Sequence, residues 1–172
     1  MRAAATLDSP AYLRLGRNKE PEIFDSLKNT PDISRPALVR EGSDGVIVAS
    51  GFILHEVLKA ADELARRGIF PRVVRITTLR PFPAEYIRLL IAENGPLMTV
   101  EEHIASGGLG MEISRLVAES GHGKCFRMLT IPAEFPDACY DRDSLLVRSG
   151  LDAGSIAIAY RRLSRPETDR DD

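Results

Sequence analysis

The residues most suited to chemistry lie together in one stretch of this sequence, residues 101–110. Glu102 and His103 follow an apolar run and precede a loop that is rich in glycine: Gly107, Gly108 and Gly110. A carboxylate beside an imidazole can transfer a proton or hold a metal ion. A loop that leads into a helix can bind an anion, because the free N–H groups of the first helical turn point outward from it.

The same spacing also fits a purely structural role. A tight strand-to-helix turn requires glycine whether or not it binds a ligand, and this loop lacks the complete glycine pattern of a dinucleotide-binding turn. No third ligand lies at a short fixed spacing from Glu102 and His103, so the sequence indicates no metal site. On spacing alone we favour the structural interpretation and keep the anion site as an alternative.

Two arginines near the N-terminus form a second candidate site. Arg14 and Arg17 flank Gly16 at the end of a short predicted strand, residues 11–15. Two guanidinium groups in this arrangement can hold a phosphate or a carboxylate by paired hydrogen bonds. A solvated surface pair has the same spacing, and without further information that interpretation is favoured.

Composition excludes several classes of protein. The chain has 172 residues, with 23 Lys and Arg against 25 Asp and Glu, so it offers no basic surface for nucleic acid. Its apolar runs are too short to span a bilayer, and its N-terminus lacks the apolar core of a secretory signal. Cys125 and Cys139 form neither a disulfide framework nor a metal motif, and we expect both to be small core residues. We expect a cytoplasmic protein.

From residue 37 onward, predicted strands and helices alternate. Residues 37–40 and 46–49, joined by five residues, predict an antiparallel hairpin. The alternation after it is typical of a mostly parallel sheet with helices on both faces. We predict a three-layer α/β/α fold with about five strands, one of them an antiparallel edge strand. The later predicted strands cover residues 72–76, 97–100 and 126–131, and the predicted helices cover 52–67, 84–93, a segment after 110, 145–149 and 155–163.

The rest of the chain divides into three parts. Residues 1–17 are interpreted as the end of a neighbouring domain, because a helix tail and one strand cannot form a sheet by themselves. Residues 18–36 are rich in proline and polar residues and are predicted to be a linker. Residues 37–163 form the main domain, and the charged residues 164–172 are predicted to be a disordered tail.

Several segments, taken in order, resemble the transketolase-like enzymes that depend on thiamine diphosphate. The resemblance covers about residues 1–163. The first segment is similar to the last strand of the family's pyrimidine-binding domain, and the others are similar to the opening, the proline turn, the EEH–GGLG signature and the closing stretch of its C-terminal domain: residues 9–17, 41–51, 78–83, 100–110 and 132–156.

The resemblance implies part of an enzyme. Members combine a diphosphate-binding, a pyrimidine-binding and a C-terminal domain, and the first two hold thiamine diphosphate and Mg between them at a dimer interface. The GDG metal motif and the glutamate that activates the cofactor are missing from this sequence. The resemblance therefore implies that other subunits or upstream sequence carry those two domains, in a hetero-oligomer or a dimer, and that this chain alone binds no cofactor.

The resemblance also implies a role for one arginine. Arg17 aligns best with a family arginine that contacts the sugar-phosphate substrate, and Arg14 is the second choice. Thr77 stands where deoxyxylulose-phosphate synthases carry another phosphate-binding arginine, which weakens that identity. The implied reaction is two-carbon ketol transfer, with no catalytic residue in this chain. The alternative is a non-catalytic interaction or regulatory module that binds a small anion at residues 106–110.

Overall fold

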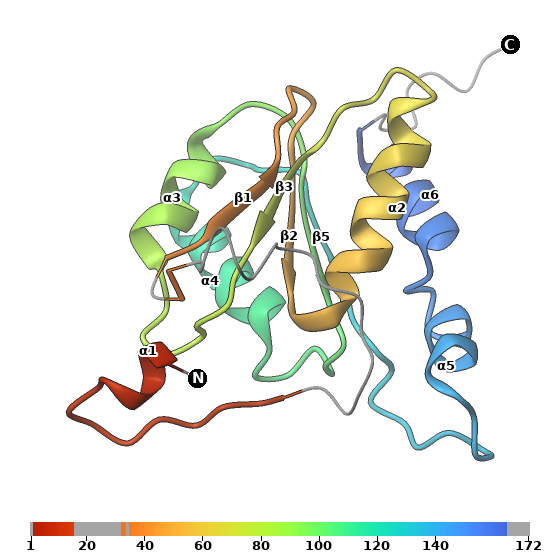
Figure 1. Ribbon diagram of the computed structural model, residues 1–172. Coiled ribbons are helices and arrows are strands. Elements are labelled where there is room, and N and C mark those ends of the chain that lie inside the picture. Colours follow the sequence, from red (N-terminus) through yellow and green to blue (C-terminus); the bar gives the residue numbers. More distant parts are fainter. Residues whose placement is uncertain (1, 16–31, 34, 165–172) are drawn as a thin grey trace, which may run out of the picture.

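The computed structural model describes residues 2–15, 32–33 and 35–164. These residues form one five-stranded sheet with helices on both faces (Figure 1). The strands are β1 (Ala37–Arg40), β2 (Val46–Ser50), β3 (Arg72–Arg75), β4 (Leu97–Glu101) and β5 (Phe126–Leu129). The helices are α1 (Arg2–Ala5), η1 (Gly51–Ile53), α2 (Leu54–Ala65), α3 (Ala84–Ala92), α4 (Leu109–Ser120), α5 (Arg142–Arg148) and α6 (Ala153–Ser164).

The order of the strands in the sheet is β1–β3–β2–β4–β5. Strands β2 to β5 run parallel to one another, and β1 runs antiparallel to β3 at one edge. This arrangement confirms the predicted three-layer fold with a mostly parallel sheet and one antiparallel edge strand.

The predicted hairpin between β1 and β2 is wrong, because β3 lies between them. Ala37 pairs with Arg75 on one side of β3, and Val46 pairs with Arg72 on the other. Nearly all of β2 is buried, so it takes a central position, whereas β1 is only partly buried and suits an edge. A five-residue connection allows either arrangement, and the burial of β2 decides between them.

Alternating residues of the central strands supply two separate apolar cores. Ile47 of β2 faces α2 and α6, where it packs in a cluster with Leu54 and Tyr160. Val48 points to the opposite face and packs with residues of α3 and α4 such as Ile87. This period-two alternation is what a sheet covered on both faces requires.

Other expectations change at the level of single elements. Residues 11–15, predicted as a strand, are exposed and form no strand. The helix predicted over 145–149 begins earlier, at Arg142, because the Asp141 side chain accepts a hydrogen bond from the Ser144 N–H at 2.8 Å. Cys125 and Cys139 are exposed and are not core residues.

Most of the predicted linker and residues 165–172 of the predicted tail lie outside the described residues. None of the helices described is long and apolar enough to cross a membrane.

Candidate functional site

The candidate loop lies at the end of the molecule where the parallel strands finish, at the bottom of Figure 1. The chain leaves β2 for β3 on one side and later returns to β4 on the other side of β2. Open α/β sheets bind ligands at such a reversal of strand order. The loop between β4 and α4 therefore has the right position for a site, and its contacts decide what it does.

The start of α4 is occupied by a carboxylate of the chain itself. Glu101, the last residue of β4, is 4% exposed. Its Oε2 accepts a hydrogen bond from the Leu109 N–H at 2.8 Å, and its Oε1 accepts one from the Gly110 N–H at 2.8 Å. These are the free donors of a helix start, so Glu101 takes the place that an external anion would occupy.

The glycines of the loop allow this close contact. A Cβ on Gly108 would lie 2.4 Å from Glu101 Oε2, and a Cβ on Gly110 would lie 2.8 Å from Met128 Sδ. Gly107 has a φ of +77°, a left-handed conformation that glycine adopts without strain. The geometry thus favours the structural interpretation of the loop, because the donors on which the anion-site alternative depends already have a partner.

Glu102 and His103 are directed to different partners. Glu102 forms an ion pair with Arg142 at the start of α5, with Arg142 Nε at 3.2 Å from Glu102 Oε2. His103 Nδ1 lies 2.8 Å from the carbonyl oxygen of Ile104. Within the part of the chain that the structure describes, no group of three or more His, Cys, Asp or Glu side chains could hold a metal ion.

The two N-terminal arginines are not brought to this loop by any described contact. Arg14 is exposed in the extended segment 11–15, and Arg17 lies outside the described residues. The assignment of Arg17 to substrate binding therefore stays a prediction.

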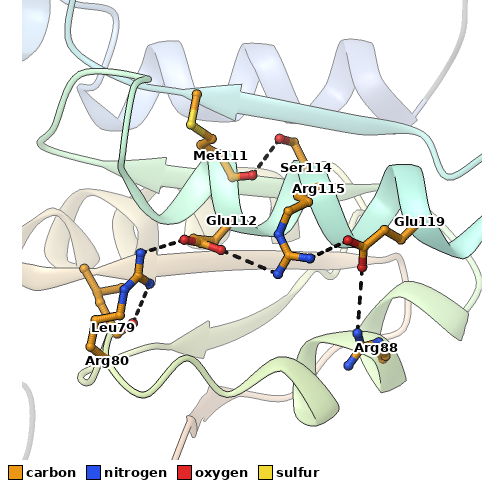
Figure 2. Close-up of polar contacts among 8 residues, drawn as sticks. All are labelled: Leu79, Arg80, Arg88, Met111, Glu112, Ser114, Arg115 and Glu119. Atoms are coloured by element: carbon orange, nitrogen blue, oxygen red, sulfur yellow. Dashed lines mark hydrogen bonds and ion pairs between the residues drawn. The ribbon is translucent and has the colours of Figure 1, made fainter.

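Sequence reasoning missed a line of charges that fixes α4 from outside (Figure 2). Arg80 Nη2 lies 2.6 Å from Glu112 Oε1, and Glu112 Oε2 lies 3.7 Å from Arg115 Nη2. Arg115 also pairs with Glu119, which lies 3.8 Å from Arg88 of α3. Charges three and four residues apart on one helix are a readable signal, and here they continue into the neighbouring elements.

A second set of contacts fixes the chain between β5 and α5. The Tyr140 hydroxyl donates to Asp137 Oδ1 at 2.8 Å, and Arg148 Nη2 lies 3.2 Å from the same oxygen. The Arg148 guanidinium also lies 4.4 Å from the centre of the Tyr140 ring. The Tyr140 hydrogen bond and the Arg148 charge lower the pKa of Asp137. Phe135, just before this cluster, is fully exposed at 101%.

The opposite end of the sheet is closed by the loop between α4 and β5. Lys124 Nζ donates to the Glu93 carbonyl at the end of α3, and burial lowers the pKa of Lys124. His122 Nδ1 lies 2.7 Å from the Ser120 carbonyl of α4, and Cys125 Sγ lies 3.5 Å from the Leu163 carbonyl of α6. One short loop thus supplies a donor to the C-terminal end of three helices.

A family comparison identifies this domain. The model of the transketolase C-terminal domain matches residues 36–156. The chain therefore belongs to the transketolase C-terminal domain family. The match covers the five-stranded sheet and most of its helices, so the transketolase C-terminal domain is the unit that the structure describes.

Individual relatives agree with this assignment. The chain is 35% identical over 159 residues to a 1-deoxy-D-xylulose-5-phosphate synthase of Syntrophotalea carbinolica, covering 90% of the chain and 24% of the relative. It is 31% identical over 148 residues to one subunit of the apulose-4-phosphate transketolase of Actinobacillus succinogenes, covering 86% of the chain and 47% of that subunit.

A solved structure supports the same assignment. The inactive beta4 tetramer of a split-gene transketolase matches with a TM-score of 0.83 and 30% identity, covering 95% of this chain and 54% of that one. This member of the transketolase C-terminal domain family thus spans between a quarter and about half the length of these relatives.

The described residues do not fit thiamine diphosphate, the cofactor that the family resemblance implies. The helix start at the C-terminal end of the sheet is the natural place for a diphosphate, and there the Glu101 carboxylate already holds the Leu109 and Gly110 N–H groups. A second anion beside a buried carboxylate would be repelled.

Proposed function

We propose that this chain is the C-terminal part or subunit of a thiamine-diphosphate-dependent, transketolase-like transferase. The assembled enzyme would move a two-carbon ketol unit between sugar phosphates, while most of this chain supplies assembly surface. The observation that carries the proposal is the match of the whole α/β domain to relatives that are about two to four times as long. The missing length is where the cofactor domains would lie, in upstream sequence or in a partner subunit of a cytoplasmic oligomer.

Within this assembly, residues 1–17 are assigned to the pyrimidine-binding domain. Residues 11–15 are extended and exposed, with Tyr12 at 91%, which suits a strand whose neighbours belong to another domain. Docking of that strand would carry Arg17 to the substrate, where its guanidinium would hold the phosphate. The alternative, an anion-binding module, has less support because Glu101 already occupies the helix start.

Reconstitution tests the proposal. The chain would be co-expressed with a candidate partner, a polypeptide that carries a GDG motif and a pyrimidine domain, and ketol transfer would be assayed. We expect activity only in the complex, and no saturable calorimetric heat from the chain alone with thiamine diphosphate and Mg²⁺. Arg17→Ala should raise KM for the sugar phosphate by roughly tenfold or more, with Arg14→Ala as the milder control.

Two results would contradict the proposal. Tight cofactor binding by the isolated chain would place the cofactor site here and not in partner domains. A complex in which Arg17→Ala and Arg14→Ala both left KM unchanged would remove this chain from substrate binding while leaving its family membership intact.

A further inference from the structure

A groove lies at the end of the sheet where the strands begin, at the top of Figure 1. It consists of two hollows with volumes of about 400 and 410 Å³, and both are lined by Ile91, Ala92 and His122. The first hollow lies between α3 and α4, and the second reaches residues 123–125 and the end of α6. Hollows of this size hold small molecules in other proteins, and the function proposed above assigns no ligand to this groove.

The lining of the groove is partly apolar. Ile91 of α3 and Leu116 of α4 line the first hollow, and Ile91 lines the second hollow together with Leu163 of α6. His122 joins the two hollows, and its Nδ1 lies 2.7 Å from the Ser120 carbonyl oxygen, which holds the ring in place. Such a lining favours a ligand with an apolar body, because the body leaves water when it binds.

The charged side chains of the first hollow already have partners. Arg88 Nη1 lies 2.8 Å from Glu85 Oε1, and Arg88 Nη2 lies 3.8 Å from Glu119 Oε2. Glu119 also pairs with Arg115 of the same helix. These charges balance one another, so a charged group of a ligand would find its partner in the second hollow.

Lys124 supplies that partner. Its Nζ donates to the Glu93 carbonyl oxygen, whereas the Glu93 carboxylate pairs with Arg72 at 2.6 Å. Within the described residues, no carboxylate lies within ion-pair distance of the Lys124 ammonium, which has three hydrogens to donate. Burial lowers the pKa of Lys124 more than the nearby Glu93 charge raises it. A bound anion would therefore stabilise the charged form of this side chain.

We propose that the groove binds a small organic acid, a molecule with an apolar body and one anionic group. The body lies along Ile91, which lines both hollows, and the anionic group accepts a hydrogen bond from Lys124 Nζ. The groove and the loop between β4 and α4 lie at opposite ends of the sheet, so this site is separate from the one assigned to ketol transfer.

The dye 8-anilinonaphthalene-1-sulfonate tests the proposal, because it joins an aromatic body to one sulfonate. With the full chain we expect a saturable rise in fluorescence, and Lys124→Met should raise the dissociation constant by ~10-fold or more, since it removes the charge and keeps the apolar stem. Lys59→Met is the matched control, because Lys59 lies on α2, outside the groove, and pairs with Glu56. Circular dichroism would verify that each variant is folded.

Two exposed cysteines locate the bound dye in the wild-type chain. Cys125 lines the second hollow, whereas Cys139 lies between β5 and α5, outside the groove. Saturating dye should slow the alkylation of Cys125 by iodoacetamide by ~5-fold or more, because the reagent must reach the thiolate. The rate at Cys139 should not change. Mass spectrometry of the two peptides measures both rates.

Three results would overturn the proposal. The first is a fluorescence rise that does not saturate, and the second is an equal loss of affinity in Lys124→Met and Lys59→Met. The third is a Cys125 that the dye does not protect, or protects no more than it protects Cys139, which would place the dye elsewhere on the chain. None of these results bears on whether a reconstituted complex transfers ketol units.

Discussion

The two ends of the sheet are finished in different ways. At the end where the strands begin, the loop between α4 and β5 donates to the carbonyls of three helices, and the Tyr160 hydroxyl donates to the Asp44 carbonyl at 2.6 Å. At the end where they finish, Glu101 closes the start of α4, but Phe135 and the N-terminal segment leave apolar surface exposed. We call the first the closed end, because these hydrogen bonds hold its loops, and the second the open end, because more of the exposed apolar side chains of the described residues lie there.

The largest expected change in stability comes from Glu101, which lies at the open end and binds the start of α4. Glu101→Gln should lower the free energy of unfolding by about 2 to 3 kcal/mol, because an amide has one acceptor oxygen for two buried N–H groups and carries no charge. Glu102→Gln is the matched control, since its partly exposed pair with Arg142 should contribute less than about 0.5 kcal/mol. Urea denaturation measures both. Equal losses would mean that burial of Glu101 has no special energetic role.

The second effect tests the packing of the loop. Gly108→Ala should destabilise the protein by about 2 kcal/mol, because its Cβ would lie 2.4 Å from the Glu101 carboxylate. Gly154→Ala, near the start of α6, has 3.3 Å to its nearest neighbour and should change stability by less than about 0.5 kcal/mol. Thermal unfolding distinguishes the two. If Gly108→Ala melted like the parent, the loop would need another explanation.

A smaller change in stability is expected when one tyrosine hydroxyl is removed at each end, Tyr160 at the closed end and Tyr140 at the open end. Tyr160→Phe should lower the free energy of unfolding by about 1 kcal/mol, because the buried Tyr160 side chain loses its hydrogen bond to the Asp44 carbonyl at the closed end. Tyr140→Phe removes a hydroxyl at the open end, where water can replace it, and should have little effect on global stability. Denaturation curves for the two variants give the comparison. A larger loss of stability in Tyr140→Phe than in Tyr160→Phe would mean that hydrogen bonds at the open end stabilise the fold more than those at the closed end.

The smallest effect concerns the ionisation of Asp137. The pKa of this carboxyl lies below 3.8 because of the Tyr140 hydrogen bond and the Arg148 charge. A lowered carboxyl pKa adds stability above pH 3.8 that is lost as the pH falls through the folded value. Carboxyl NMR titration should show the Asp137 pKa rising in Tyr140→Phe, while the pKa of Asp141, which is lowered by Ser144, stays unchanged. A rise at both positions would indicate a general change of the loop.

Much of the fold could be predicted because its signals are local. The i, i+3, i+4 spacing of apolar residues in α2 and the short continuous apolar run of β2 predict their types without knowledge of neighbours. The pairing of β1 could not be predicted, since it depends on which strand is buried most, and that is a property of the whole sheet. The lack of a strand at residues 11–15 reflects the same limit, because a strand forms only where another strand pairs with it.

The loop between β4 and α4 could be placed from the sequence, but its contacts could not. The prediction named Glu102 and His103, whereas the buried carboxylate is their neighbour Glu101. Glu101 is the last residue of β4 and Glu102 is the first residue after it, and adjacent side chains at the end of a strand point in opposite directions. The sequence does not show which of two adjacent glutamates turns toward the start of α4.

The position of β3 between β1 and β2 also sets the order in which the sheet can grow. Strands β2 and β3 are joined through α2 as one βαβ unit, so they can pair as soon as that unit is synthesised. Strand β1 emerges from the ribosome earlier, yet its partner residues, such as Arg75 opposite Ala37, arrive only with β3. We expect β1 to join only after β2 and β3 have paired and, as a partly buried edge strand, to open before β2 in the native state. In a hydrogen-exchange experiment the amide hydrogens of β1 should therefore exchange through local opening, whereas those of β2 should exchange only through global unfolding.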